Sequence, residues 1–317
     1  MKTIELHELA IKLGIKHDLR GEEKVIKYLK RIKDKYEELP EDKKADFDLE
    51  KLKNPYLDSR VLYSNGREIK KIVAGIDMET PELLLAKGLG DIDMVLAHHP
   101  EGIALADLSD VMTLQAQVLA DYGLPINIAE SVIKPRISEV NRSISPANHN
   151  RPVQAAKMLG LDYMCLHTAA DNMAAKFVVD LIKENESELE TVGDIIKLLQ
   201  TVEEYKQAKK NKVGPSIFAG SEDSSCGKIV VTEFTGGTSG SKDVYEKMSH
   251  YGIGTVIGMH MSEEHRKEAE KYHINVLIAG HMASDSLGMN LLLDEIEKEG
   301  IEVVPMSGLI RVKRVKD

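Results

Sequence analysis

Four short apolar runs in the chain each end at a histidine, and this pattern constrains the fold more than any other feature. The runs are Met94-Val-Leu-Ala before His98, Tyr163-Met-Cys-Leu before His167, Thr255-Val-Ile-Gly-Met before His260 and Val276-Leu-Ile-Ala-Gly before His281. Each run has the length and the aliphatic or β-branched content of a buried strand. We therefore expect each histidine at the edge of an open α/β sheet, where ligands bind.

Strand and helix signals alternate along most of the chain. Such alternation is typical of a three-layer α/β fold. The expected strands span residues 60–63, 69–76, 94–97, 126–128, 163–166, 228–234, 302–305 and 309–315, with two more near 256 and 276, and the expected helices span residues 108–122, 132–143, 152–159, 173–184, 192–206, 262–272 and 285–298.

Residues 1–55 differ from the rest, because Lys and Glu dominate and apolar residues recur at helical spacing. This pattern predicts an all-helical N-terminal extension with a charged loop near residues 38–44. The main domain is expected to span residues 56–317. It opens with a predicted hairpin, in which Asn65-Gly66 forms a type I′ turn between residues 60–63 and 69–76.

Composition excludes several classes of protein. The chain has 317 residues, with 42 Lys and Arg against 52 Asp and Glu and a net charge of −10, and it shows no basic patch. Nucleic acid is therefore a poor candidate partner. Cys165 and Cys226 allow at most one disulfide, which favours a reducing, cytoplasmic setting. Neither a signal peptide nor a membrane span is expected.

Carboxylates follow two of the histidines at a spacing of four residues. Asp171 follows His167, and Asp285 follows His281. If a helix starts at His281, this spacing places His281 and Asp285 on one helix face. Asp171 lies near a helix start, where a carboxylate is electrostatically favoured. A mixture of imidazoles and carboxylates suits Zn, Fe or Mn.

His98 and His99 are adjacent, and neighbours in a strand point to opposite faces. One histidine for each of two neighbouring ions is therefore the natural interpretation. Two ions a few Å apart can generate hydroxide at neutral pH and clamp an electrophile, which is hydrolytic chemistry. His167 and His260 would then have catalytic roles, either by orienting the metal ligands or by transferring protons.

Each feature also has a purely structural explanation. A histidine at a strand end can simply bond a loop, and Asp171 can cap a helix. The glycine-rich segment 236–242 could cradle phosphate or form a tight turn, and it lacks the Walker A spacing. Asp77 and Glu79 could line the same cleft or cap a helix that begins near Pro81. The remaining histidines are expected on the surface: His7, His17, His149, His250 and His273.

At these residues the chain resembles the Nif-three-like proteins (NGG-one interacting factor three), often labelled GTP cyclohydrolase I type 2-like. The resemblance covers roughly residues 60–315 and leaves the helical N-terminus outside. The segments that carry it are Gly75-Ile-Asp-Met-Glu-Thr-Pro-Glu82, Val95-Leu-Ala-His-His-Pro100, His167-Thr-Ala-Ala-Asp171 and Ala279-Gly-His-Met-Ala-Ser-Asp285.

The resemblance implies a mixed-sheet fold of two interlinked α/β subdomains, the second over roughly residues 126–275, and a ring-like homohexamer. It also implies a dinuclear metal centre, and two positions depart from the family pattern. Asp285 stands where the family usually has glutamate, and Gly258-Met259-His260 stands where the family commonly has an acid. The implied metal ligands are His98, His99, Asp171, His281 and Asp285.

The expected function is that of a metal-dependent hydrolase, binding two divalent ions of Zn, Fe or Mn. A hydroxide bridging the ions would attack a small anionic or heterocyclic substrate, while His167 or His260 moves protons. The alternative is a non-catalytic metal-binding or regulatory scaffold, since resemblance transfers a site better than a reaction. The expected partners are a small-molecule substrate and further copies of the chain, not nucleic acid or membrane.

Overall fold

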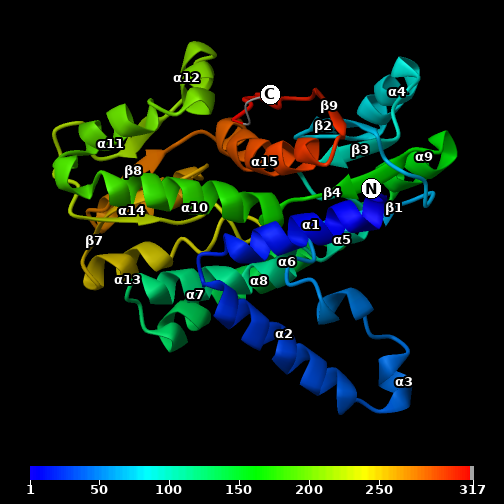
Figure 1. Ribbon diagram of the computed structural model, residues 1–317. Coiled ribbons are helices and arrows are strands. Elements are labelled where there is room, and N and C mark those ends of the chain that lie inside the picture. The colour runs from blue at the N-terminus through cyan, green and yellow to red at the C-terminus, as the bar shows by residue number, and fades with distance from the viewer. Residues whose placement is uncertain (315–317) are drawn as a thin grey trace.

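The computed structural model describes residues 1–314, which form two β-sheets enclosed by helices (Figure 1). The strands are β1 (Arg60–Tyr63), β2 (Lys71–Gly75), β3 (Met94–Ala97), β4 (Asp162–Cys165), β5 (Ser216–Ala219), β6 (Lys228–Val231), β7 (Ile253–Gly258), β8 (Asn275–Ile278) and β9 (Glu302–Pro305). The larger sheet has the order β1-β4-β3-β2-β9, and the smaller has the order β5-β8-β7-β6. The mixed α/β fold predicted from the sequence is confirmed.

Parallel pairing dominates both sheets. In the larger sheet β2 is parallel to β3 and β9, β3 is parallel to β4, and the edge strand β1 is antiparallel. In the smaller sheet β6, β7 and β8 are parallel, and β5 is an antiparallel edge. Central parallel strands are covered on both faces, which explains why β3 is an unbroken, fully buried apolar run.

Helices cover both faces of each sheet, so each sheet is the middle of three layers. The helices that do so are α1 (Thr3–Lys16), α4 (Thr80–Leu89), α7 (Thr113–Asp121), α8 (Ile126–Ile144), α9 (Arg151–Leu159), α10 (Thr168–Glu184), α11 (Val192–Leu199), α12 (Glu203–Lys210), α13 (Val244–His250), α14 (Glu263–Lys271) and α15 (His281–Lys298). The larger sheet has α4 and α9 on one face and α1, α10 and α15 on the other. The smaller sheet has α7, α8, α13 and α14 on one face and α10, α11, α12 and α15 on the other.

Two long helices, α10 and α15, run side by side and join the sheets (Figure 1). Val178 on α10 and Leu287 on α15 are buried against the smaller sheet. Met173 and Leu292, on the same two helices, are buried against the larger one. Because one helix pair contributes to both cores, the ends of the two sheets are held close together.

The N-terminal segment is helical, as predicted, and its first helix belongs to the core. Leu6 and Ala10 on α1 are buried with strand residues of the larger sheet. The next helices, α2 (Glu22–Glu37) and α3 (Glu41–Lys44), extend away from the body (Figure 1). The 3-10 helix η1 (Leu49–Leu52) returns to it, where Lys51 pairs with Asp110. A domain boundary at residue 55 stays a prediction. Within residues 1–314, no helix is long and apolar enough to cross a membrane.

The hairpin predicted over residues 60–76 is wrong, because β1 pairs with β4 while β2 pairs with β3 and β9. The predicted type I′ turn is absent too: residues 64–67 form no turn, and of the two central residues only Gly66 has a positive φ, 73°. Asp162 on β4 accepts the backbone N–H of Asn65 at 2.8 Å and the Ser64 hydroxyl at 2.7 Å. This carboxylate holds residues 64 and 65 beside β4, and β2 lies on the other side of β3.

Other differences are local. Residues 126–128 begin α8 instead of forming a strand, because Ala129, Ile133 and Val140 recur at helical spacing and are buried. The expected strand over 309–315 is absent from residues 309–314, and residue 315 lies outside the described residues. The predicted helix over 108–122 is interrupted between α6 (Leu108–Val111) and α7, and the predicted helix over 192–206 is interrupted between α11 and α12. The helix predicted from residue 173 already begins at Thr168. The edge strand β5 was not predicted. The remaining short helices are α5 (Gly102–Ala106) and η2 (Glu186–Glu188).

Candidate metal centre

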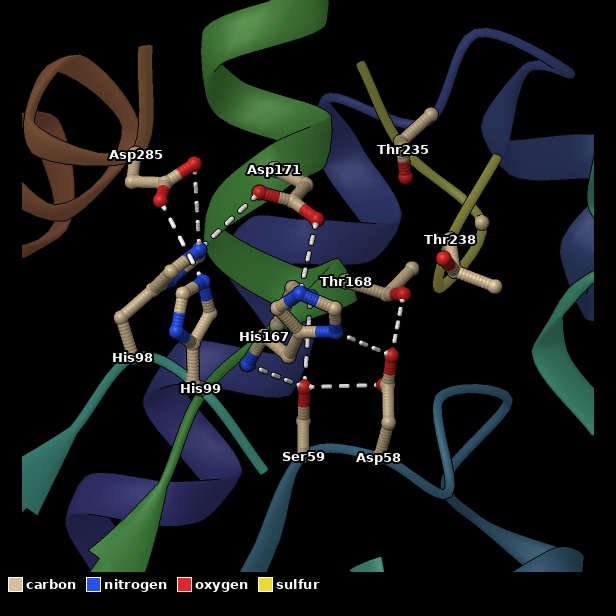
Figure 2. A network of polar contacts seen from close by, with 12 residues as sticks. Asp58, Ser59, His98, His99, His167, Thr168, Asp171, Thr235, Thr238 and Asp285 are labelled. Carbon is tan, nitrogen blue, oxygen red and sulfur yellow. Dashed lines mark hydrogen bonds and ion pairs between the residues drawn. The ribbon is translucent and has the colours of Figure 1, made fainter. Parts of the chain in front are cut away.

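The carboxyl ends of β3, β4, β7 and β8 meet between the two sheets, and the histidines that follow these strands meet there too. The ring centroids of His98 and His167 lie 5.0 Å apart, those of His99 and His281 5.4 Å, and those of His260 and His281 4.8 Å. Asp171 reaches the same place from the first turn of α10, and Asp285 reaches it from one turn into α15 (Figure 2). All seven predicted site residues are thus brought together.

The start of α15 depends on a glycine. Gly280 has a φ of 109°, and a Cβ there would lie 2.8 Å from the Val213 carbonyl oxygen. Both the left-handed backbone and the close approach require glycine. The helix then begins at His281, as the four-residue spacing predicts, and Nε2 of His281 lies 3.5 Å from Oδ2 of Asp285.

Asp285 lies at the centre of the cluster and is completely buried. Its Oδ1 is 3.6 Å from Nε2 of His98, and its Oδ2 is 3.4 Å from Nε2 of His99. Nε2 of His98 is also 3.3 Å from Oδ1 of Asp171 (Figure 2). One oxygen of this carboxylate therefore faces His98, and the other faces both His99 and His281.

Several of these atoms have no hydrogen-bond partner among residues 1–314. They are Nε2 of His98, Oδ1 of Asp171 and both carboxylate oxygens of Asp285. Buried polar atoms are normally satisfied, and leaving one unsatisfied costs about 1–3 kcal/mol. A set of unpaired imidazole and carboxylate atoms that converge in this way fits bound metal, which would satisfy them.

Three overlapping groups of side chains have the geometry to hold a metal ion. In each group, one potential ligand atom from every member lies within 4.8 Å of the others. Asp285 belongs to two groups and connects them. The groups are His98 with Asp171 and Asp285, His99 with His281 and Asp285, and His98 with His99 and His167.

One solved structure matches the chain over nearly its whole length. A NIF3 superfamily protein from Sphaerobacter thermophilus has 27% sequence identity and a TM-score of 0.79, over 98% of this chain and 99% of that chain. The chain belongs to the NIF3 superfamily. Because the match covers 98% of the chain, it includes the N-terminal helices, which the sequence resemblance had left outside.

Two further matches are more distant. Reduced HcgD from Methanocaldococcus jannaschii has 12% identity and a TM-score of 0.47, over 78% of this chain and 87% of that chain. A Bacillus cereus protein related to NIF3 has 8% identity and a TM-score of 0.43, over 82% and 93%. No family model matches the chain, and no curated protein matches it.

In this NIF3 chain, four histidines around the cluster are each held at Nδ1. His98 bonds the carbonyl of Leu166 at 3.1 Å, His99 bonds Asp77 at 2.6 Å, His167 bonds Asp58 at 2.9 Å and His260 bonds Ser239 at 2.9 Å. Such partners fix the orientation of metal-binding histidines and their tautomer. For His98, His99 and His167 the other ring nitrogen, Nε2, faces a carboxylate of the cluster.

The charges of the cluster are strongly coupled. Burial lowers the pKa of His98, but Asp285 and Asp171 outweigh it and raise this pKa well above its usual range. Burial is likewise outweighed at His99, where the bonds to Asp285 and Asp77 raise the pKa to about 9. In return the histidines hold the pKa of Asp285 far below its usual range. Opposite charges thus stabilise one another inside the protein.

Solvent reaches the cluster from one side. The side chain of His281 is 38% exposed and that of His99 is 26% exposed, whereas Asp171 and Asp285 are buried. Burial lowers the pKa of both His281 and His260, which favours the neutral imidazole that binds metals. The side of His99 and His281 is therefore where a small molecule could approach.

The two acids after β2 have different roles. Asp77 bonds His99 and belongs to the site. Glu79 is the N-cap of α4, where its backbone N–H donates to the Glu82 carboxylate at 2.9 Å, and its side chain pairs with Arg151. The sequence allowed either role for both acids. In the structure Asp77 contacts the site, and Glu79 caps α4.

The glycine-rich loop lies beside His260 and is packed tightly. Side chains satisfy its carbonyl groups, with Gln115 donating to Gly236 and Thr238 and His265 bonding Gly240. A Cβ on Gly236 would lie 2.8 Å from Cγ of Gln115. Close packing against α6 and α7 therefore explains the glycines, and α13 begins only afterwards, at Val244.

Sequence reasoning missed Asp58 and Ser59, which bond His167 and the start of α10. No motif marks them, and they simply precede an edge strand. It also placed His7 on the surface, which is wrong. His7 is 2% exposed, and its Nε2 bonds the Ser59 carbonyl at 3.0 Å, because α1 is part of the core.

Proposed function

We propose that the chain is a hydrolase that depends on two divalent metal ions. The observation that supports this proposal is the central position of Asp285. Its two oxygens are buried, lack a hydrogen-bond partner among residues 1–314, and face His98 on one side and His99 on the other. A carboxylate so placed suits a bridge between two ions.

The geometry suggests how the ligands are divided. One ion would be held by His98, Asp171 and Asp285, and the other by His99, His281 and Asp285. Imidazole and carboxylate ligands suit Zn, Fe or Mn. Asp285 has a shorter side chain than the glutamate common in the family, so ions held by it would lie closer to α15.

Two adjacent ions supply activated water and hold the electrophile, which is the chemistry of hydrolysis. The chain's own residues contribute orientation and proton transfer. Nε2 of His167 lies 3.7 Å from Oδ2 of Asp171, so His167 is placed to exchange a proton beside the ligands. His260 lies against His281, on the accessible side. A small anionic or heterocyclic substrate would enter there.

Elemental analysis tests the metal site before any substrate is known. The His98→Ala variant should lose one of the two ions, and Asp285→Ala should lose both, while circular dichroism confirms folding. His250→Ala, on the exposed face of α13, is the matched control and should keep both ions. Unchanged metal content in both site variants would disprove the proposed centre.

Hydrolysis is tested separately with metal-loaded protein and a panel of nucleotides and cyclic amides. Turnover that disappears with chelator and in Asp285→Ala supports the hydrolase. Metal binding without any turnover favours the scaffold, in which the ions serve sensing, storage or assembly. We also propose a cytoplasmic homohexamer, which analytical ultracentrifugation and cell fractionation would test.

A further inference from the structure

A carboxylate outside the proposed ligand set holds His167. Asp58 is completely buried, and its Oδ2 lies 2.9 Å from Nδ1 of His167. The same oxygen accepts the hydroxyl of Thr168 at 2.6 Å (Figure 2). Since the hydroxyl proton of Thr168 already points to this carboxylate, Asp58 acts as an acceptor, and His167 must donate from Nδ1.

Ser59 fixes the backbone of the same segment. Its hydroxyl oxygen accepts the backbone N–H of His167 at 2.9 Å and that of Ala169 at 3.3 Å. These are N–H groups at the start of α10, which have no partner within the helix. Asp58 and Ser59 together therefore fix both the ring of His167 and the helix start that carries Asp171.

Helix α1 supports this pair through a contact with Ser59. The carbonyl of Ser59 accepts Nε2–H of His7 at 3.0 Å and the side-chain amide of Asn54 at 2.8 Å. A Cβ on Gly14 of α1 would lie 2.9 Å from Cα of Ala169, so α1 touches the first turn of α10 directly. The N-terminal helix thus supports the metal centre from the side opposite the ligands.

We propose that Asp58 and Ser59 are positioning residues, braced by α1, that keep His167 in the Nδ1–H tautomer with the lone pair of Nε2 facing the metal ligands. This proposal rests on the proposed function and specifies how His167 would serve as its base. A base that takes a proton at Nε2 must not already carry one there. A carboxylate at Nδ1 provides that selection without contacting the substrate.

The tautomer can be observed directly by magic-angle-spinning NMR on protein labelled with ¹⁵N at histidine and equilibrated with Zn²⁺. The His167 signals are assigned from their absence in His167→Gln. The wild-type ring should carry its proton at Nδ1 and none at Nε2. A proton at Nε2 in the wild type overturns the proposal, and this result needs no variant at Asp58.

Asp58→Asn tests the cause, because the amide can donate to Nδ1 and so favours a proton at Nε2. Most of the His167 population should change tautomer, while the zinc content stays as in the wild type. Asp162→Asn is the matched control, since Asp162 is equally buried and bonds Ser64 but no histidine. A wild-type tautomer in Asp58→Asn contradicts the proposal.

The two proposals fail in different ways. If His98→Ala and Asp285→Ala retain their metal, the proposed function fails whatever the state of His167. If those variants lose metal but His167 is protonated at Nε2, only the positioning role fails. Ser59→Ala should give a mixture of the two tautomers, because the carboxylate remains while the backbone of residues 167–169 loosens.

Discussion

Gly288 on α15 touches the carbonyl group of Ala170 on α10, and a Cβ at position 288 would lie 2.9 Å from the Ala170 carbonyl carbon and 3.3 Å from Cβ of Ala174. Each helix carries one carboxylate of the cluster, Asp285 or Asp171, near this contact. The distance between the two acids therefore depends on a glycine that is not itself a ligand.

Gly288→Ala should destabilise the protein, although alanine normally stabilises a helix. The methyl group must push α10 and α15 apart, and overpacking of this kind costs about 1–3 kcal/mol. Urea denaturation would measure the loss, and elemental analysis should show less bound metal. Gly88→Ala on α4 is the control, because nothing lies within 4 Å of its Cβ position, and we expect a gain of about 0.5–1 kcal/mol. Equal behaviour of the two variants would contradict the packing argument.

The gathering of the candidate residues in one place could largely be predicted from the sequence, because the signals for it are local. A histidine after a buried strand is placed at the sheet edge by the strand itself, and His281 with Asp285 needs only one helical turn. Such rules act over a few residues and do not depend on how the two sheets are arranged. Parallel strands then bring distant segments together.

What could not be predicted depends on pairing between distant segments. Asn65-Gly66 forms no type I′ turn, because the carboxylate of Asp162 holds the backbone of Asn65 beside β4. Asp58 has no motif, and its role follows only from the approach of the β1 edge to α10. His7 lies in a charged helix whose buried face becomes apparent only when α1 packs on the larger sheet.

Asp77→Asn should weaken one ion more than the other. The Asp77 carboxylate bonds Nδ1 of His99, and His99 belongs to a different metal group from that of Asp171. Loss of such a partner reduces metal affinity by about 10–100-fold. Competition with a chromophoric chelator would separate the two binding steps. Asp91 is an exposed acid paired with Lys71, and Asp91→Asn should leave the affinities of both binding steps unchanged. Equal weakening of both steps would refute this division of ligands.

Removal of metal should lower the stability of the wild type. A metal that binds only the folded chain stabilises it by about 2.7 kcal/mol at a concentration of 100 times its Kd. Thermal denaturation with Zn²⁺ and with EDTA measures this difference. The denaturation temperature of Asp285→Ala should change with neither Zn²⁺ nor EDTA, because the central ligand is lost. A zinc-dependent shift that persists in Asp285→Ala would mean that the metal binds elsewhere.

The stability of the protein should also depend on pH through His7, which lies on α1 and belongs to none of the three metal-holding groups. Burial lowers the pKa of His7, against a smaller opposing effect of the hydrogen bond to Ser59. The unfolded chain, with a histidine pKa near ~6.5, then binds protons more readily than the folded protein. The free energy of unfolding should therefore fall as the pH drops below about 6.5, and this contribution should be constant at higher pH.

His7→Gln isolates this contribution, since glutamine retains an N–H donor for the Ser59 carbonyl but does not titrate. Urea denaturation in EDTA, at pH values of about 5 and about 7.5 on either side of the histidine range, should show a smaller pH dependence for His7→Gln than for the wild type. His250→Gln, at an exposed position, should follow the wild type. Parallel pH dependence in His7→Gln and the wild type would show that His7 is not the group that resists protonation. α1 would then support Ser59 without linking the fold to pH.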